Sequence, residues 1–256
     1  MKRVLVPIDF SKSSEYAAKT ANKIALKTKG EVYLLHMVEL PTGIVDMGSG
    51  SNFSIPTSML YLKKVKEQIK NIKQTYFDKK VVLHHSIRFE DPHQGILNYT
   101  AKIKADIVIM GSKGHSEIEE ILIGSNTEKV VRTSTVPVLV VKRDNDVFEI
   151  KDIVFASNFK KEIKKEVFQK VINFAKLFKS KIHLVSINTP SNFETTYDSK
   201  KKIENFVKGL DLKNLTINIY NDYTIEKGII NFSRNMEADI IALSTHGRSG
   251  LSHLFS

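Results

Sequence analysis

Three glycines in the middle of the chain have a spacing that suits phosphate binding. Gly111 and Gly114 follow the apolar run Ile107–Met110, and Gly124 stands further on, directly before Ser125, so the pattern is G-x2-G-x9-G-S. Glycine allows a positive φ and lets a ligand come close to the main chain, where a Cβ would intrude. The pattern therefore predicts a turn that a phosphate chain can approach.

A helix start is predicted directly after the third glycine. Ser125 and Glu128 have the S-x-x-E spacing of a capping box, so we expect Ser125 to cap a helix that runs to about Thr133. The unpaired N–H groups and the positive dipole end of such a helix attract anions. We expect a phosphate chain between this helix start and the glycine turn.

The glycine stretch lies between two apolar segments that read as buried parallel strands. Ile107–Met110 precedes it and Val136–Val141 follows it. Two better-known phosphate-binding patterns, G-x4-G-K-[S/T] and G-x-G-x-x-G, are absent from the chain. The flanking strands, the capping box and the spacing all favour a phosphate site of a third kind.

A carboxylate ends the first predicted strand, Arg3–Asp9. Ligands bind at the carboxyl ends of strands in an open parallel sheet, and Asp9 there can accept hydrogen bonds from ribose hydroxyls. Asp9 can equally help to cap the helix that follows, in which Ser11 or Ser13 is the expected N-cap. Position alone leaves both interpretations of Asp9 open.

Four segments together resemble the nucleotide-binding signature of the universal stress protein family. They are Val-Pro-x-Asp at the end of the first strand, then MGSKG, ILIGSNTEKV and PVLVVK. The resemblance covers nearly the whole chain. It implies an α/β fold of two tandem, doubly wound, parallel-sheet lobes, Rossmann-like and similar to the adenine nucleotide alpha hydrolases.

The same resemblance implies that the first lobe binds ATP, or AMP or ADP, with or without Mg²⁺. Lys113 stands where many members carry His, and its ammonium would add a point charge beside a phosphate. Asn126 lies within the phosphate-binding turn. The resemblance assigns the other residues as follows: Pro7 and Asp9 to the ribose or adenine side, the Met37 backbone to adenine, and Gly111, Gly114, Gly124, Ser125 and Thr127 to ribose and phosphates.

The chain repeats itself, which predicts two domains at 1–143 and 151–256. The strand patterns of the first copy recur about 150 residues later, and the spacing then shortens by about 17 residues. Asn158 takes the place of Asp9, and Ser244 takes the place of Gly111. We expect the second copy to lack its last helix and strand, and only the first copy to bind nucleotide.

Composition narrows the class of protein. The chain has 256 residues, 41% of them hydrophobic, with no cysteine and a formal charge of +11. No apolar run approaches the length of a membrane span, and no leader-like segment precedes the first strand, so we expect a cytoplasmic protein. The basic residues are mostly Lys rather than Arg, which argues against nucleic-acid binding.

The sequence predicts no catalytic residue and no metal site. His84 and His85 are adjacent on a strand, so their side chains point to opposite faces and cannot share a metal ion. His36 and His183 lie within apolar strands and read as core histidines with satisfied hydrogen bonds. Hydrolysis of a bound nucleotide, if it occurs, is expected to be slow.

By resemblance, the predicted function is a stress-response protein whose bound nucleotide gates dimerisation or partner binding. The exposed edge of the Val136–Val141 strand is then expected to pair between chains and form a homodimer. The main alternative is a nucleotide-free dimeric scaffold in which the loop glycines serve only as turns. A weak ATPase is the third hypothesis.

Overall fold

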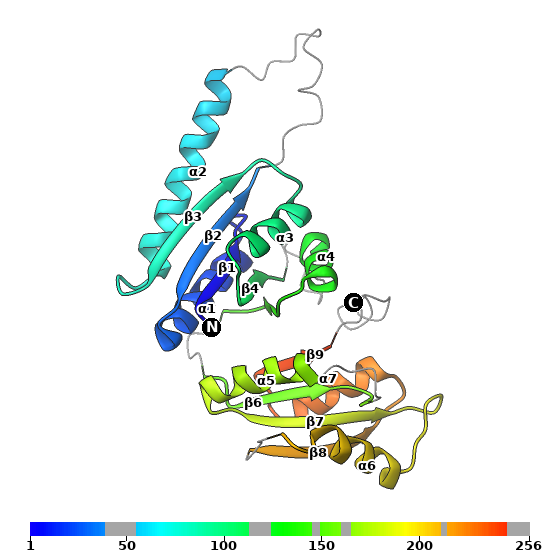
Figure 1. Cartoon of the computed structure of the whole chain (residues 1–256). Helices are drawn as coiled ribbons and strands as arrows, with labels where there is room; N and C mark the ends of the chain where they lie inside the picture. The colour runs from blue at the N-terminus through cyan, green and yellow to red at the C-terminus, as the bar shows by residue number, and fades with distance from the viewer. Residues whose placement is uncertain (39–54, 113–123, 145–148, 160–164, 211–213, 245–256) are drawn as a thin grey trace. The chain divides into compact units, whose positions relative to one another are not determined.

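The chain forms two compact units, Met1–Asp146 and Val147–Phe255, which are called unit 1 and unit 2 below. The structure is a computed structural model and describes residues 1–38, 55–112, 124–144, 149–159, 165–210 and 214–244 (Figure 1). Within these ranges, no helix is both long enough and apolar enough to cross a membrane. Each unit is an α/β structure built on a parallel sheet.

The sheet of unit 1 has five parallel strands in the order β3-β2-β1-β4-β5. Its central strands are almost inaccessible to solvent because helices cover both faces of the sheet. This burial on both faces explains why the strands are continuous apolar segments, as the sequence analysis expected for a parallel sheet. The strands are β1 (Arg3–Pro7), β2 (Glu31–Met37), β3 (Val82–Arg88), β4 (Ile107–Gly111) and β5 (Val138–Val141).

In the described part of unit 1, four helices connect the strands. Helix α1 packs against α2, and α3 packs against α4. Ile96 of α3 and Val130 of α4 belong to one apolar cluster with Leu5, Leu35 and Val108 of the sheet. The predicted doubly wound arrangement is confirmed. The helices are α1 (Lys12–Thr28), α2 (Ile55–Tyr76), α3 (Pro92–Lys102) and α4 (Ser125–Thr133).

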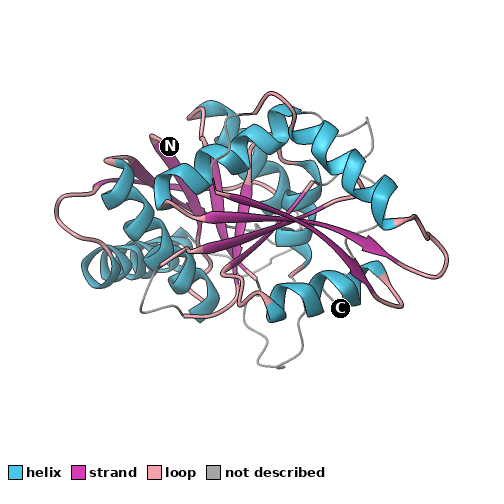
Figure 2. Ribbon diagram, turned by 90° about the horizontal axis from the view of Figure 1, so that it is seen from below, coloured by secondary structure: helices cyan, strands magenta, loops and turns pink. Residues whose placement is uncertain are grey.

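The described part of unit 2 has a four-stranded parallel sheet in the order β8-β7-β6-β9 (Figure 1). One face is filled by phenylalanines, among which Phe155 and Phe168 have ring centroids 4.7 Å apart. Figure 2 shows the strands with helices around them. The elements are β6 (Asp152–Ala156), α5 (Lys165–Phe178), β7 (Lys181–Asn188), α6 (Thr196–Val207), β8 (Leu215–Asn221), α7 (Ile225–Asn235) and β9 (Ile240–Leu243).

The backbone of unit 2 repeats local features of unit 1. Non-glycine residues adopt a positive φ at matching places: after the first strand, after the first helix, and before the fourth strand. An aspartate carboxylate also clamps the first strand in each unit: Asp106 accepts from the N–H of Arg3 at 2.9 Å, and Asp239 from that of Asp152 at 3.0 Å. The positive-φ pairs are Phe10 and Phe159, Lys29 and Lys179, and Lys104 and Glu237.

Candidate functional site

The candidate site of unit 1 lies where the strand order reverses. Strand β1 pairs with β2 on one side and with β4 on the other, so chain segments leave the carboxyl ends of β1 and β4 side by side. Such a switch point leaves a crevice in open parallel sheets. Pro7 ends β1, and Gly111 ends β4.

Asp9 follows β1 and is exposed, and one of its two carboxylate oxygens is engaged by the start of α1. Its Oδ1 accepts a hydrogen bond from the Ser11 N–H at 3.0 Å and another from the Ser11 hydroxyl at 2.5 Å. Among the described residues, no hydrogen bond to Oδ2 of Asp9 is made. Asp9 therefore supports the helix start and still presents one free acceptor at the switch point.

Ser11 is the N-cap of α1, one of the two residues predicted for that position. Its Oγ accepts from the Ser14 N–H at 3.3 Å and lies 3.1 Å from the Ser13 Oγ. These hydroxyls hold one another and the Asp9 carboxylate in a small network. Helix capping therefore accounts for the position of the Ser11 hydroxyl.

Gly111 is required for packing and not for backbone conformation. A Cβ placed on Gly111 would lie 2.5 Å from the carbonyl carbon of Ser13 and 2.6 Å from its oxygen. The φ of Gly111 is outside the left-handed region, so the backbone freedom that glycine allows is not used at this position. The reason is tertiary: the first turn of α1 passes over the end of β4, and only glycine leaves room for it.

The predicted capping box at the start of α4 was wrong. The helix begins at Ser125, and its N-cap is Gly124, which has no side chain to accept a hydrogen bond. Gly124 donates its own N–H to the Ser112 carbonyl at 2.6 Å, which fixes the approach of the chain from β4. The N–H groups of the first turn of α4 are thus left without a side-chain cap, at the positive end of the helix dipole.

Thr127 joins α4 directly to the end of β4. Its buried hydroxyl donates to the Gly111 carbonyl at 3.0 Å. Because Thr127 Oγ1 holds β4 against the first turn of α4, it brings the third glycine of the pattern close to the first. Ser125 is exposed and Asn126 is half-buried on the same turn.

Three predicted site residues remain. The structure describes Met37 but not Lys113 and Gly114. Met37 ends β2, and its side chain reaches α3, where a Cβ on Gly95 would lie 2.1 Å from the Met37 Cε. Lys113 and Gly114 lie outside the described residues. The structure therefore brings Asp9, Gly111 and the α4 start together and gives no position for the middle of the glycine pattern.

His36 also lies at this site, and the sequence predicted only a part of its environment. It is 7% exposed, its Nδ1 donates to the Ile8 carbonyl at 2.9 Å, and its ring lies 4.5 Å from the Phe10 ring. Its buried Nε2 has no hydrogen-bond partner among the described residues, so the expectation of full satisfaction was wrong for this nitrogen. His183 is satisfied as predicted, by Asp152 and Thr216.

Burial lowers the pKa of His36 from its ordinary value near 6.5, and this outweighs the Ile8 carbonyl and the Asp9 charge, which raise it. His36 is therefore a neutral hydrogen-bond donor to the loop that carries Asp9. A signal for this role was present in the sequence, because a polar residue interrupts an apolar strand beside the Asp9 strand. The described residues contain no cluster of three or more potential metal ligands.

Comparison with known proteins identifies the family of this chain. The sequence profile of the Universal stress protein family matches residues 1–142, which are more than half of the chain, so this chain belongs to that family. It is similar to a universal stress protein from Methanocaldococcus jannaschii, with 33% identity over 156 residues that cover 56% of this chain and 96% of the relative. A second universal stress protein of that organism is 33% identical over 142 residues, or 56% of this chain and 82% of the relative.

A solved structure shares the fold over almost the whole chain. It is a universal stress protein from Archaeoglobus fulgidus, with a TM-score of 0.72 and 19% sequence identity over 99% of this chain and 88% of that chain. At this identity the likeness concerns the fold alone. It agrees with the two parallel-sheet units of the present chain.

Proposed function

We propose that unit 1 binds an adenine nucleotide, ATP or its mono- or diphosphate, at the carboxyl ends of β1 and β4. The observation that carries the proposal is the convergence of three features at the switch point. Asp9 offers a free carboxylate oxygen, Gly111 ends its strand without a side chain, and α4 begins without a side-chain cap. Membership of the family and the glycine spacing support it.

The proposed roles follow from the chemistry of each group. Asp9 Oδ2 accepts hydrogen bonds from ribose hydroxyls, while Oδ1 remains on Ser11. The free N–H groups at Ser125 and Asn126 take the phosphates at the positive end of α4. Pro7 and the Met37 backbone lie on the adenine side, and Lys113 and Gly114 complete the phosphate turn, as the family resemblance implies.

The two structural roles found at this site favour a second candidate function. Asp9 holds the start of α1, and Gly111 accommodates it, so both residues would be needed in a protein that binds no nucleotide. That candidate is a nucleotide-free scaffold that acts through dimerisation. A scaffold of this kind requires the same packing of Asp9 and Gly111 against the start of α1. It does not require a hydrogen bond to Asp9 Oδ2.

One experiment separates the two candidates. The purified protein is denatured, and the released small molecules are separated by ion exchange beside ATP, ADP and AMP standards. Titration with ATP follows, on the wild type and on Gly114→Val, which places a branched side chain in the glycine pattern. Stoichiometric nucleotide that is lost in Gly114→Val supports the proposal, whereas a protein that is empty and ignores added ATP supports the scaffold.

We further propose that nucleotide binding controls self-association through the outer edge of β5. All four residues of β5, Val138–Val141, are partly exposed, and β5 is the last strand of its sheet. An apolar edge strand of this kind pairs readily with another chain. Light scattering should give a dimeric mass that Val140→Lys shifts to a monomer, and a monomeric wild type with or without ATP would contradict the proposal.

A further inference from the structure

Three consecutive apolar side chains are exposed near the start of helix α2, and they are called the apolar tip below. Met59 is 67% exposed, Leu60 is 68% exposed and Tyr61 is 43% exposed. Successive residues of a helix point about 100° apart, so these side chains surround most of the helix rather than one face of it. Exposed apolar groups that gather in one place mark a surface that binds another molecule.

The later part of α2 is packed against unit 1. Val65, Ile69 and Ile72 are buried, and their spacing of four and three residues places them on one face of the helix. Tyr76, the last residue of α2, donates its hydroxyl to the Glu15 carboxylate of α1 at 2.8 Å. Figure 1 shows the first turns of α2 rising past the tip of β3. The apolar tip is therefore carried by a helix that is anchored at its other end.

Three lysines, called the lysine collar below, follow the apolar tip. Lys63, Lys64 and Lys66 are exposed and lie about 5 to 9 Å beyond Leu60 along the helix axis. Within the described part of the chain, no ion pair engages any of them. Glu67 is the only acidic residue in the sequence of α2. The surface beside the apolar tip is thus positively charged.

This arrangement favours a lipid surface over a protein surface. A flat protein face would cover only one side of the apolar tip, whereas a fluid interface surrounds side chains that point in several directions. Anionic headgroups attract lysine, whose long side chain keeps its ammonium at headgroup level while its methylene groups lie on apolar surface. The lysine collar of one chain would repel that of a second copy, which disfavours self-association through the apolar tip.

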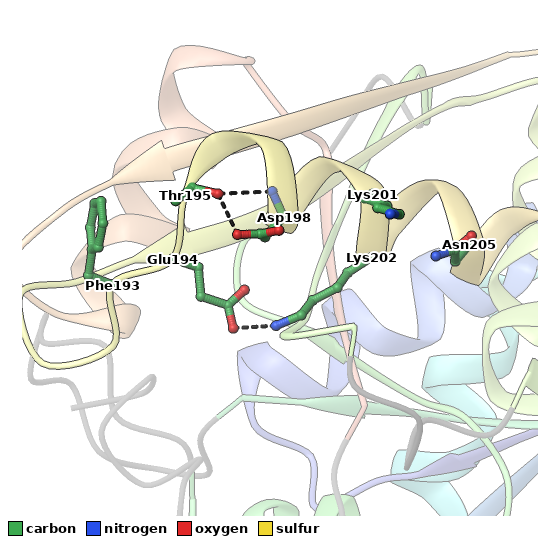
Figure 3. A pocket seen from close by; sticks show the side chains of 7 residues that line it. All are labelled: Phe193, Glu194, Thr195, Asp198, Lys201, Lys202 and Asn205. Atoms are coloured by element: carbon green, nitrogen blue, oxygen red, sulfur yellow. Dashed lines mark hydrogen bonds and ion pairs between the residues drawn. The ribbon is translucent and has the colours of Figure 1, made fainter.

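Unit 2 also exposes an aromatic group, but the charges near it are balanced. Phe193 adjoins a hollow in which Lys202 forms an ion pair with Glu194, and the Thr195 hydroxyl donates to Asp198 at 2.6 Å (Figure 3). These polar groups satisfy one another, and the Phe193 ring lies apart from the ion pair. The start of α2 differs because its exposed apolar groups are accompanied by unpaired positive charge.

We propose that unit 1 binds the surface of a membrane that contains anionic phospholipids. The apolar tip inserts among the headgroups, and the lysine collar contacts their phosphate and carboxylate groups. The distance between the two along the helix matches the depth to which interfacial helices are buried, about 5 to 10 Å. Contact of this kind needs no membrane-spanning segment, and it does not depend on nucleotide binding by unit 1.

Tryptophan fluorescence tests the insertion directly. The chain contains no tryptophan, so Leu60→Trp introduces a single fluorophore at the apolar tip. Its emission should shift to shorter wavelength when vesicles of phosphatidylcholine and phosphatidylserine in equal parts are added to the full chain. Phe193→Trp is the control, because Phe193 is also highly exposed but lies in unit 2, and its emission should stay unchanged. An unshifted emission in Leu60→Trp would overturn the proposal.

Vesicle co-sedimentation separates insertion from the general attraction of a chain with a formal charge of +11. The double variant Met59→Ser, Leu60→Ser keeps every charge and replaces only exposed groups, so it should fold normally. It should bind the anionic vesicles about tenfold more weakly than the wild type. An unchanged affinity would overturn the proposal. A smaller mass of this variant in light scattering, with vesicle binding intact, would assign the apolar tip to a second copy instead.

The lysine collar is tested with two variants of equal charge. Lys63→Gln together with Lys64→Gln should weaken vesicle binding about tenfold. Lys79→Gln together with Lys80→Gln removes the same charge from exposed residues just after the end of α2 and should bind like the wild type. Equal losses in the two variants would overturn the proposal in favour of non-specific attraction. Binding to soluble polyglutamate without binding to vesicles would assign the lysine collar to an acidic protein.

Discussion

Strands β4 and β9 occupy the same place in the two units but differ in how far they are covered. Val108 of β4 is completely buried, whereas Ile241, its counterpart in β9, is 41% exposed. In unit 1, β4 has β5 beside it and α4 above it, and the described part of unit 2 has no strand beyond β9. The same apolar pattern thus gives a core strand in one unit and an edge strand in the other.

The two units also show which repeated features serve the scaffold and which serve a site. The positive-φ residues and the Asp106 and Asp239 clamps recur, so they belong to the fold. Asp9 and Gly111 do not recur, because Asn158 and Ser244 replace them. Differences between copies of one scaffold therefore point to residues that only one copy needs.

The largest expected difference between the units is at the end of the fourth strand. Gly111→Ala should lower the free energy of unfolding by about 3 kcal/mol, because its Cβ meets the main chain of Ser13, which cannot move aside cheaply. Ser244→Ala, at the matching place in unit 2, should change it by less than about 0.5 kcal/mol. Urea denaturation of both variants measures the free energy of unfolding. Equal losses in the two variants would contradict the expected difference between the units.

The next largest difference concerns β4 and β9 themselves. Val108→Ala should cost about 2 kcal/mol because it leaves a cavity in a closed core. Ile241→Ala removes a larger group but should cost less than about 1 kcal/mol, since part of that group is already in water. Thermal and urea unfolding give both values. A larger cost at Ile241 would show that β9 is covered in solution.

The proposed nucleotide site gives a smaller and more specific prediction. Asp9→Asn keeps an oxygen for the Ser11 hydrogen bonds but removes the charge, so ATP affinity should fall about tenfold, or about 1.4 kcal/mol, with little loss of stability. Asn158→Asp should leave ATP affinity unchanged, and isothermal titration calorimetry tests both. An unchanged affinity in Asp9→Asn would remove Asp9 from the site.

The smallest effect is a pH dependence that comes from His36, whose place in unit 2 is taken by Ser186. Burial lowers the pKa of His36 below the unfolded value near 6.5, so the unfolded chain binds the proton more readily. The stabilisation is complete above pH 6.5 and is lost as the pH falls below it. His36→Gln should flatten this slope in unfolding experiments, and an identical slope in the variant would exclude His36 as its source.

Much of the fold was predictable because its signals are local. The apolar runs, the serine that caps α1 and the repeat of the strand patterns gave the doubly wound, parallel, two-unit architecture, and they placed Asp9 and Gly111 at strand ends. The family resemblance was confirmed by the match to residues 1–142. The errors fell on Ser125 and His36, where the local pattern fits more than one tertiary arrangement.

The sequence by itself determined the order of the elements, the family and the residues that differ between the two copies. Periodicity, turn residues and internal repetition are local properties of the sequence and need no knowledge of tertiary contacts. Only the tertiary structure decided the uses of particular groups. Gly111 is needed because α1 crosses it, and Asp9 divides its oxygens between a helix start and solvent. Asn188 and Asn221 lie side by side at the ends of β7 and β8 because the two strands pair in parallel, although the residues are distant in sequence.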